Sequence, residues 1–132
     1  METDSGGADV VEAAWQELLG ADYVSEELVA AACAEPRLRQ LYPWVGMWEL
    51  HFSRCTEKRW TWDVPYIGPL AAGRQHAGRY YVAGPSRTEK VGVAATAREA
   101  VAMVVERLPA GCGPAFVGTP EELAEHERTG RR

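Results

Sequence analysis

The sequence predicts a single α+β domain in which helices pack on one face of an antiparallel β-sheet of about four strands. The chain has 132 residues, 46% of them hydrophobic, which is enough for one core and too little for two domains. Helical periodicity occurs near both ends of the chain. Strand-like alternation, broken by Gly and Pro, occupies the middle. Helices and strands segregated in this way are typical of an α+β fold.

The N-terminal third is expected to be helical. Residues 1–8 are acidic and glycine-rich and are expected to be disordered, so that the folded domain covers residues 9–128. Apolar side chains follow helical spacing over residues 9–19. Ser25 is a suitable cap for a second helix that ends near residue 34, and Pro36 suits the first turn of a short third helix.

Four strands are expected to follow. Residues 47–53 alternate, with Trp48, Leu50 and Phe52 on one side and the polar residues on the other. Residues 60–64 alternate in the same way and are expected to pair with them as a hairpin. Turn residues then bound a third strand over residues 78–83 and a fourth over residues 90–94.

The C-terminal part carries two helix-start signals. Thr96 and Glu99 have capping-box spacing, which predicts a helix to about residue 108. Residues 115–117 suggest one more short strand. Thr119 followed by Pro120 and Glu122 predicts a last helix, and the basic tail, residues 129–132, is expected to fray.

Composition excludes several classes of function. The net charge of −5 and pI near 5.2 argue against nucleic acid as the partner. No apolar run approaches the ~20 residues of a membrane span, and the acidic start does not resemble a secretory signal, so a cytosolic protein is expected. Three cysteines without CxxC spacing predict reduced thiols and no metal site. Phosphate-binding, dinucleotide-binding and HExxH motifs are missing from the sequence, so we expect no cofactor.

Residues 42–66 hold four of the five tryptophans and several charged groups. Tryptophan buries a large apolar surface while its indole N–H needs a partner. Such a cluster is either the anchor of the core or the wall of a binding groove. Most candidate ligand-binding residues fall in this stretch: Trp44, Arg54, Lys58, Trp60, Trp62 and Tyr66.

His51 and Glu49 are the main acid–base candidates. They lie two residues apart on the polar side of an expected strand, so both side chains point the same way, and a carboxylate beside an imidazole orients its tautomer. Asp63, across the expected hairpin, was a candidate third member. The alternative is a half-exposed strand face with ordinary polar residues. His76 and His126 are expected to be solvated.

Five segments of the sequence resemble an actinobacterial family of small natural-product biosynthesis proteins, which includes or neighbours the lysinoalanine synthases of cinnamycin- and duramycin-type lanthipeptide clusters. The likeness covers about residues 34–122 and is carried by residues 34–43, 50–54, 62–65, 82–86 and 108–115. These segments consist mainly of residues that mark turns and the ends of helices and strands, and they contain no catalytic motif.

The resemblance implies a defined reaction. A peptide lysine amine adds to a dehydroalanine β-carbon, which requires a neutral amine and later a proton at the α-carbon, but no metal or redox cofactor. Free lysine has a pKa near ~10.4, so desolvation or a base is needed. The resemblance implies that the aromatic residues hold the peptide, that Arg54 or Lys58 binds its carboxylate or carbonyls, and that His51 or Asp63 moves the proton. A hydroxylated aspartate of the substrate is the alternative base.

A small domain has difficulty surrounding such a peptide, so a twofold homodimer with the groove near its interface is expected. Two other function classes stay open. One is a peptide-binding accessory or immunity-like module that performs no chemistry. The other is a small acid–base cyclase or isomerase that acts on another natural product.

Overall fold

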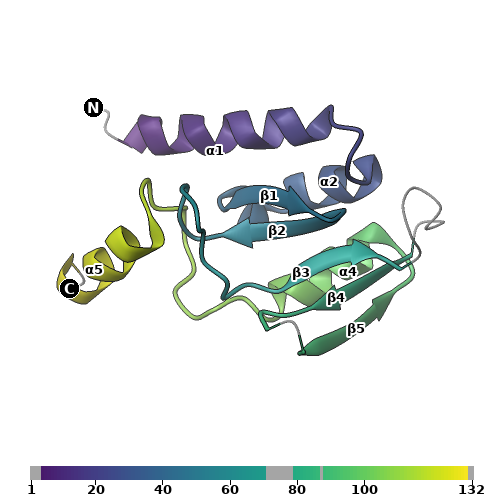
Figure 1. The fold of residues 1–132 in the computed structure, drawn as a ribbon. Helices are drawn as coiled ribbons and strands as arrows, with labels where there is room; N and C mark the ends of the chain where they lie inside the picture. The colour runs from purple at the N-terminus through teal and green to yellow at the C-terminus, as the bar shows by residue number, and fades with distance from the viewer. Residues whose placement is uncertain (1–3, 71–78, 87, 131–132) are drawn as a thin grey trace.

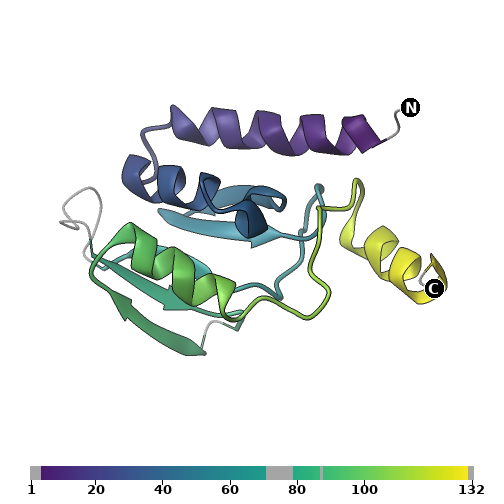
Figure 2. The same ribbon diagram turned by 180° about the vertical axis from the view of Figure 1, so that it is seen from behind.

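The computed structural model describes residues 4–70, 79–86 and 88–130, with the side chains of 9–129 in these ranges. A five-stranded antiparallel sheet has the order β1-β2-β3-β4-β5. Helices α2 and α4 cover one face, and α1 packs on α2 and β1 (Figure 1, Figure 2). This confirms the predicted single α+β domain, with one strand more than expected. The strands are β1 (Tyr42–Gly46), β2 (Glu49–Ser53), β3 (Tyr66–Pro69), β4 (Tyr80–Ala83) and β5 (Lys90–Ala94).

The helices begin where the sequence offers caps. Ser25 accepts from the Leu28 amide at 3.2 Å, and Thr96 accepts from the Glu99 amide at 3.1 Å. At the last helix Thr119 and Glu122 cap each other, with N···O distances of 2.9 and 3.1 Å. The helices are α1 (Asp4–Leu19), α2 (Glu26–Cys33), α3 (Pro36–Arg39), α4 (Ala97–Val105) and α5 (Pro120–Gly130).

The apolar core lies between the sheet and these helices. Trp15 of α1 is fully buried and packs near Phe52 of β2, with 6.3 Å between ring centroids. Its indole N–H donates to the carbonyls of Arg39 and Leu41 at 2.9 and 3.1 Å, which ties α1 to the start of β1. Other core residues from the sheet are Leu50, Ile67, Tyr80, Val82 and Ala94.

The predicted hairpin between residues 47–53 and 60–64 is wrong. β2 pairs with β1 instead, and Gly46 stands opposite Glu49, so Met47 and Trp48 form a two-residue turn. Both have positive φ, 52° and 68°. Hairpins favour this geometry because it matches strand twist, but it usually requires Asn or Gly. Residues 60–64 instead belong to the connection between β2 and β3, and they form no strand.

Other boundaries differ in smaller ways. α1 begins at Asp4, so residues 4–8 are not the expected disordered terminus, and residues 1–3 lie outside the described part. α4 ends at Val105 rather than near residue 108. Residues 115–117 contribute one bridge, between Phe116 and Cys55, and α5 extends into the expected tail. The expected strand over residues 90–94 matches β5. The expected strand over residues 78–83 corresponds to β4, and residue 78 lies outside the described ranges.

In the part of the chain that the structure describes, none of the helices has the length and hydrophobicity needed to span a membrane. Cys33, Cys55 and Cys112 are free thiols. Burial raises the pKa of Cys33 and of Cys112, which keeps both thiols protonated near neutral pH.

Candidate functional site

β2 presents different chemistry on its two sides. Leu50 and Phe52 face the helices, whereas Glu49, His51 and Ser53 project from the opposite side of the sheet, which we call the second face. The second face was expected to be half exposed. In fact Glu49 and His51 are each only 4% exposed and Ser53 is fully buried, because side chains from β1, β3, β4 and the β2–β3 connection surround them.

A buried hydrogen-bond chain runs across the second face. His51 Nε2 lies 3.1 Å from Glu49 Oε1, which confirms that the two side chains meet as predicted. The Tyr81 hydroxyl of β4 donates to the other carboxylate oxygen, Oε2. When Glu49 is ionised it can only accept, so His51 Nε2 is the donor and the lone pair of the neutral imidazole is on Nδ1. This is the arrangement in which a carboxylate orients a histidine base.

Aromatic rings enclose His51. Trp44 stacks on one side, at 4.1 Å between centroids and 12° between planes. Tyr66 stacks at 4.6 Å and 23°. Trp62 meets the imidazole edge-on at 5.3 Å, and Trp60 stacks on Trp44 at 4.3 Å. We call Trp44, Trp60, Trp62 and Tyr66 the aromatic cluster. Trp44, Trp62 and Tyr66 contact the predicted base directly, Trp60 packs behind Trp44, and Trp62 keeps 47% of its surface exposed.

The β2–β3 connection places two of these tryptophans over the sheet. Ser53 Oγ donates to the Cys55 carbonyl at 2.7 Å and accepts from the Thr61 amide at 3.1 Å. The Thr61 hydroxyl accepts from the Arg54 amide at 2.8 Å. The two ends of the loop are therefore held together beside β2, and Trp60 and Trp62 on either side of Thr61 fold back onto the second face.

Asp63 pairs with an arginine in the structure. Its Oδ2 accepts from Arg54 Nε at 2.7 Å, and Arg54 also pairs with Glu127 of α5 at 2.6 Å. Burial opposes the charge of Arg54, but the hydrogen bonds to Asp63 and Glu127 outweigh it and raise the pKa of the guanidinium. Tyr81 therefore stands beside Glu49, whereas Asp63 is joined to α5 through Arg54, and a proton-transfer role for Asp63 stays a prediction.

The other charged candidates are placed less centrally. Lys58 Nζ lies 6.0 Å from the centre of the Trp60 ring, and its side chain is exposed. His126 packs on Phe116 at 5.0 Å on the far side of the β2–β3 connection, in α5. His76 lies outside the described residues.

Polar atoms are also buried inside and beside the aromatic cluster. The indole N–H groups of Trp44 and Trp60 and Oδ1 of Asp63 are buried without a hydrogen-bond partner among the described residues. An unsatisfied buried donor or acceptor costs about 1–3 kcal/mol.

Sequence reasoning missed Tyr81 and Gly68. Gly68 of β3 stands directly opposite Tyr81, and a Cβ at this glycine would lie within 2.8 Å of Tyr81 Cε2. The bare backbone lets the tyrosine ring cross β3 toward Glu49. A glycine inside a strand can indicate that an aromatic side chain of the neighbouring strand crosses over it. The sequence reveals this only when the pairing register of the two strands is known.

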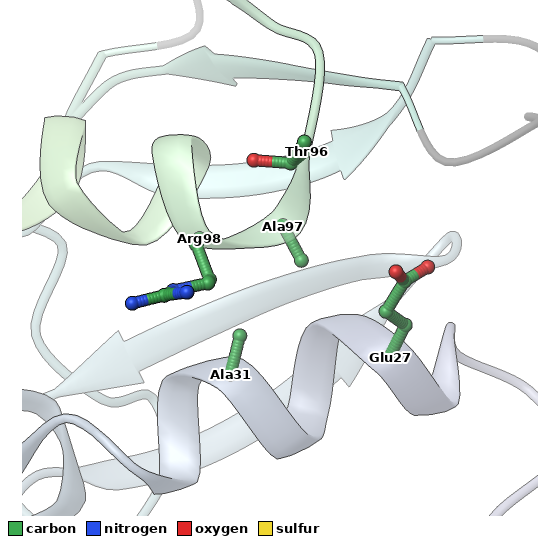
Figure 3. Close-up of a pocket in the computed structure, with 5 residues that line it drawn as sticks. All are labelled: Glu27, Ala31, Thr96, Ala97 and Arg98. Atoms are coloured by element: carbon green, nitrogen blue, oxygen red, sulfur yellow. The ribbon is translucent and has the colours of Figure 1, made fainter.

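A separate hollow lies on the helical side, between α2 and α4 (Figure 3). It is lined by Glu27, Ala31, Thr96, Ala97 and Arg98. In Figure 3 the two alanines face each other across the gap, with the charged side chains of Glu27 and Arg98 to either side. These residues supply no imidazole or thiol.

The fold and site define a small α+β domain with a carboxylate–imidazole pair buried under aromatic side chains. The chain belongs to the DUF6193 family, a family of unknown function whose model matches residues 9–119. No curated protein and no solved structure matches the chain.

Proposed function

We propose that this protein is a cytoplasmic, cofactor-free enzyme of natural-product biosynthesis that forms a lysinoalanine cross-link in a lanthipeptide. The observation that carries the proposal is the buried His51–Glu49 pair, at 3.1 Å, in contact with the aromatic cluster. The sequence likeness to small natural-product biosynthesis proteins supports the choice of substrate class. The proposed site residues are His51 as base, Glu49 as its orienting partner and Trp62 as the exposed contact for the peptide.

The reaction needs one proton acceptor and one proton donor. The lysine nitrogen bonds to the β-carbon of dehydroalanine, and the electron pair of the C=C bond moves toward the α-carbon and its carbonyl. The nitrogen loses one proton and the α-carbon gains one, with no leaving group. His51 is suited to take the first proton and return it, because Glu49 orients its imidazole.

The reaction also requires that the peptide be held in position, and we propose that the aromatic cluster does this. Holding an amine against an alkene in a near-attack geometry contributes up to ~7–11 kcal/mol in ideal cases. Trp62 is half exposed and touches both Trp44 and His51, so a peptide packed on Trp62 lies beside the imidazole. Lys58 is the better cation for a substrate carboxylate, because Arg54 is engaged by Asp63 and Glu127.

A twofold homodimer completes the proposal. The reason is size, because one small domain has difficulty surrounding a peptide of this kind. Light scattering at micromolar concentration is expected to give twice the 14.5 kDa mass of one chain. A mass of one chain over that range would exclude a shared groove.

The test is incubation of the folded protein with a dehydrated, cyclised lanthipeptide precursor. Addition of lysine to dehydroalanine leaves the mass unchanged, so the product is detected by loss of thiol-reactive dehydroalanine and by missing fragments in tandem mass spectrometry. We expect both changes to depend on the protein. Binding without cross-linking would favour the peptide-binding module, and no binding at all would favour a cyclase or isomerase acting on another natural product.

A further inference from the structure

A row of three residues crosses the second face at the level of Glu49. Leu50 stands opposite Ile67 in the β2–β3 pair, so Glu49 and Gly68 lie next to each other on the second face. Gly68 stands opposite Tyr81 in the β3–β4 pair. Tyr81 therefore reaches Glu49 over the backbone of β3, and its hydroxyl donates to Oε2.

The residues of this row leave space for the contact between Tyr81 and Glu49. A Cβ at Gly68 would overlap the tip of the Tyr81 ring, so any larger residue there displaces the phenol from the carboxylate. Tyr80, the neighbour of Tyr81, points to the opposite side, where it is fully buried in the core and its hydroxyl lies 2.9 Å from Ser25 Oγ. The two consecutive tyrosines of β4 thus lie on opposite sides of the sheet, Tyr80 in the core and Tyr81 on the second face.

Both oxygens of Glu49 have a donor in this arrangement, His51 on Oε1 and Tyr81 on Oε2. Loss of the Tyr81 donor from Oε2 changes the orientation and charge distribution of the carboxylate, and with them the hydrogen bond between Oε1 and His51. Tyr81 is partly exposed, whereas Glu49 and His51 are buried, so the chain of hydrogen bonds leads inward from the molecular surface.

We propose that Tyr81 is a positioning residue that acts on His51 through Glu49, and that Gly68 provides the space this requires. The proposal rests on the proposed function for its catalytic consequence, because His51 is the base there. The hydrogen-bond chain itself can be tested without any substrate.

The first test is ¹⁵N NMR of the histidine side chains in the full chain without ligand. The chain has three histidines, and His51→Gln identifies the signals of His51. In the wild type we expect the Nε2–H tautomer of His51. In Tyr81→Phe we expect the same tautomer with shifted Nε2 and Nδ1 resonances, because the hydrogen bond to Glu49 has changed. Tyr80→Phe is the matched control, since it removes a hydroxyl from the same strand on the other face, and it should leave the His51 signals unchanged.

The second test is the cross-linking rate. Tyr81→Phe should lower kcat about tenfold, a part of the ~10²–10⁴ that a positioned general base contributes, and leave KM unchanged. Gly68→Ala should reproduce the NMR change. His51 signals in Tyr81→Phe or Gly68→Ala that match those of the wild type would overturn the proposal. Changed His51 signals in Tyr81→Phe without any cross-linking by the wild type would refute the proposed function and leave the positioning role of Tyr81 standing.

Discussion

The two faces of β2 bury side chains of opposite character to a similar depth. Leu50 and Phe52 lie in an apolar core under the helices, and Glu49 and His51 lie under aromatic rings on the second face, none of them more than 4% exposed. A buried, hydrogen-bonded polar pair adds little stability compared with apolar residues of the same volume. The apolar side therefore contributes most of the folding free energy of β2, and the polar side is where we propose a function.

Leu50→Ala tests the helical face and has the largest expected effect. Leu50 is fully buried in the core cluster, and truncation of such a residue costs about 2–5 kcal/mol through lost burial and a residual cavity. We expect chemical denaturation to show a free energy of unfolding lower by that amount. A loss below about 1 kcal/mol would show that the core can collapse around the gap, and the contrast between the faces would weaken.

Trp62→Ala tests the second face. Because Trp62 is 47% exposed and its indole N–H donates only to the Arg59 carbonyl at 3.2 Å, we expect little change in the free energy of unfolding. Peptide binding should weaken by about 1–2 kcal/mol, as for an aromatic residue at the centre of an interface, and cross-linking should fall with it. Circular dichroism is the control for folding. Unchanged binding of the precursor would remove Trp62 from the site.

The ion pair between Glu12 and Arg39 lies on the helical side and can be compared with the buried His51–Glu49 pair. Its removal has the smallest expected effect on stability. The Glu12–Arg39 ion pair of 2.6 Å is largely solvent-accessible, and the hydrogen bond from Arg39 is the main cause that lowers the pKa of Glu12. A lowered pKa contributes stability above the unfolded value, about 4.3, and this stability is lost as pH falls through the folded pKa.

The melting temperature of the wild type should therefore fall more steeply between about pH 5 and pH 3 than that of Glu12→Gln. The Glu35→Gln variant is a suitable control, because the carboxylate of Glu35 accepts from the Arg37 backbone amide instead of pairing with a cation. Parallel curves for wild type and Glu12→Gln would show that the exposed pair contributes nothing.

The sequence predicted the helix starts and the two sides of β2, because both depend on contacts between residues close in the sequence. The caps of α2, α4 and α5 were visible because Ser25, Thr96 and Thr119 bond to amides three residues away. The alternation in residues 49–53 also placed Glu49 and His51 on one side of a strand. In these cases the residues that make the contact are close in the sequence.

Pairing and burial could not be predicted in the same way. The β1–β2 turn uses Met47 and Trp48 at positive φ, where Asn or Gly would have marked it. Residues 60–64 alternate like a strand, but Trp60 has a φ of 56° and the segment is held by Ser53 instead of a sheet partner. The burial of His51 results from this connection folding over the second face, and that depends on contacts between residues far apart in the sequence.

His51→Gln is the variant that decides whether the buried His51–Glu49 pair serves chemistry. The glutamine amide can still donate to Glu49 from near the position of Nε2, but it has no basic nitrogen. The measurement is the cross-linking rate at saturating precursor, with binding and thermal stability determined on the same sample. We expect a folded protein that binds the precursor like the wild type and cross-links it on the order of 10² times more slowly. Cross-linking by His51→Gln at the wild-type rate would contradict the account.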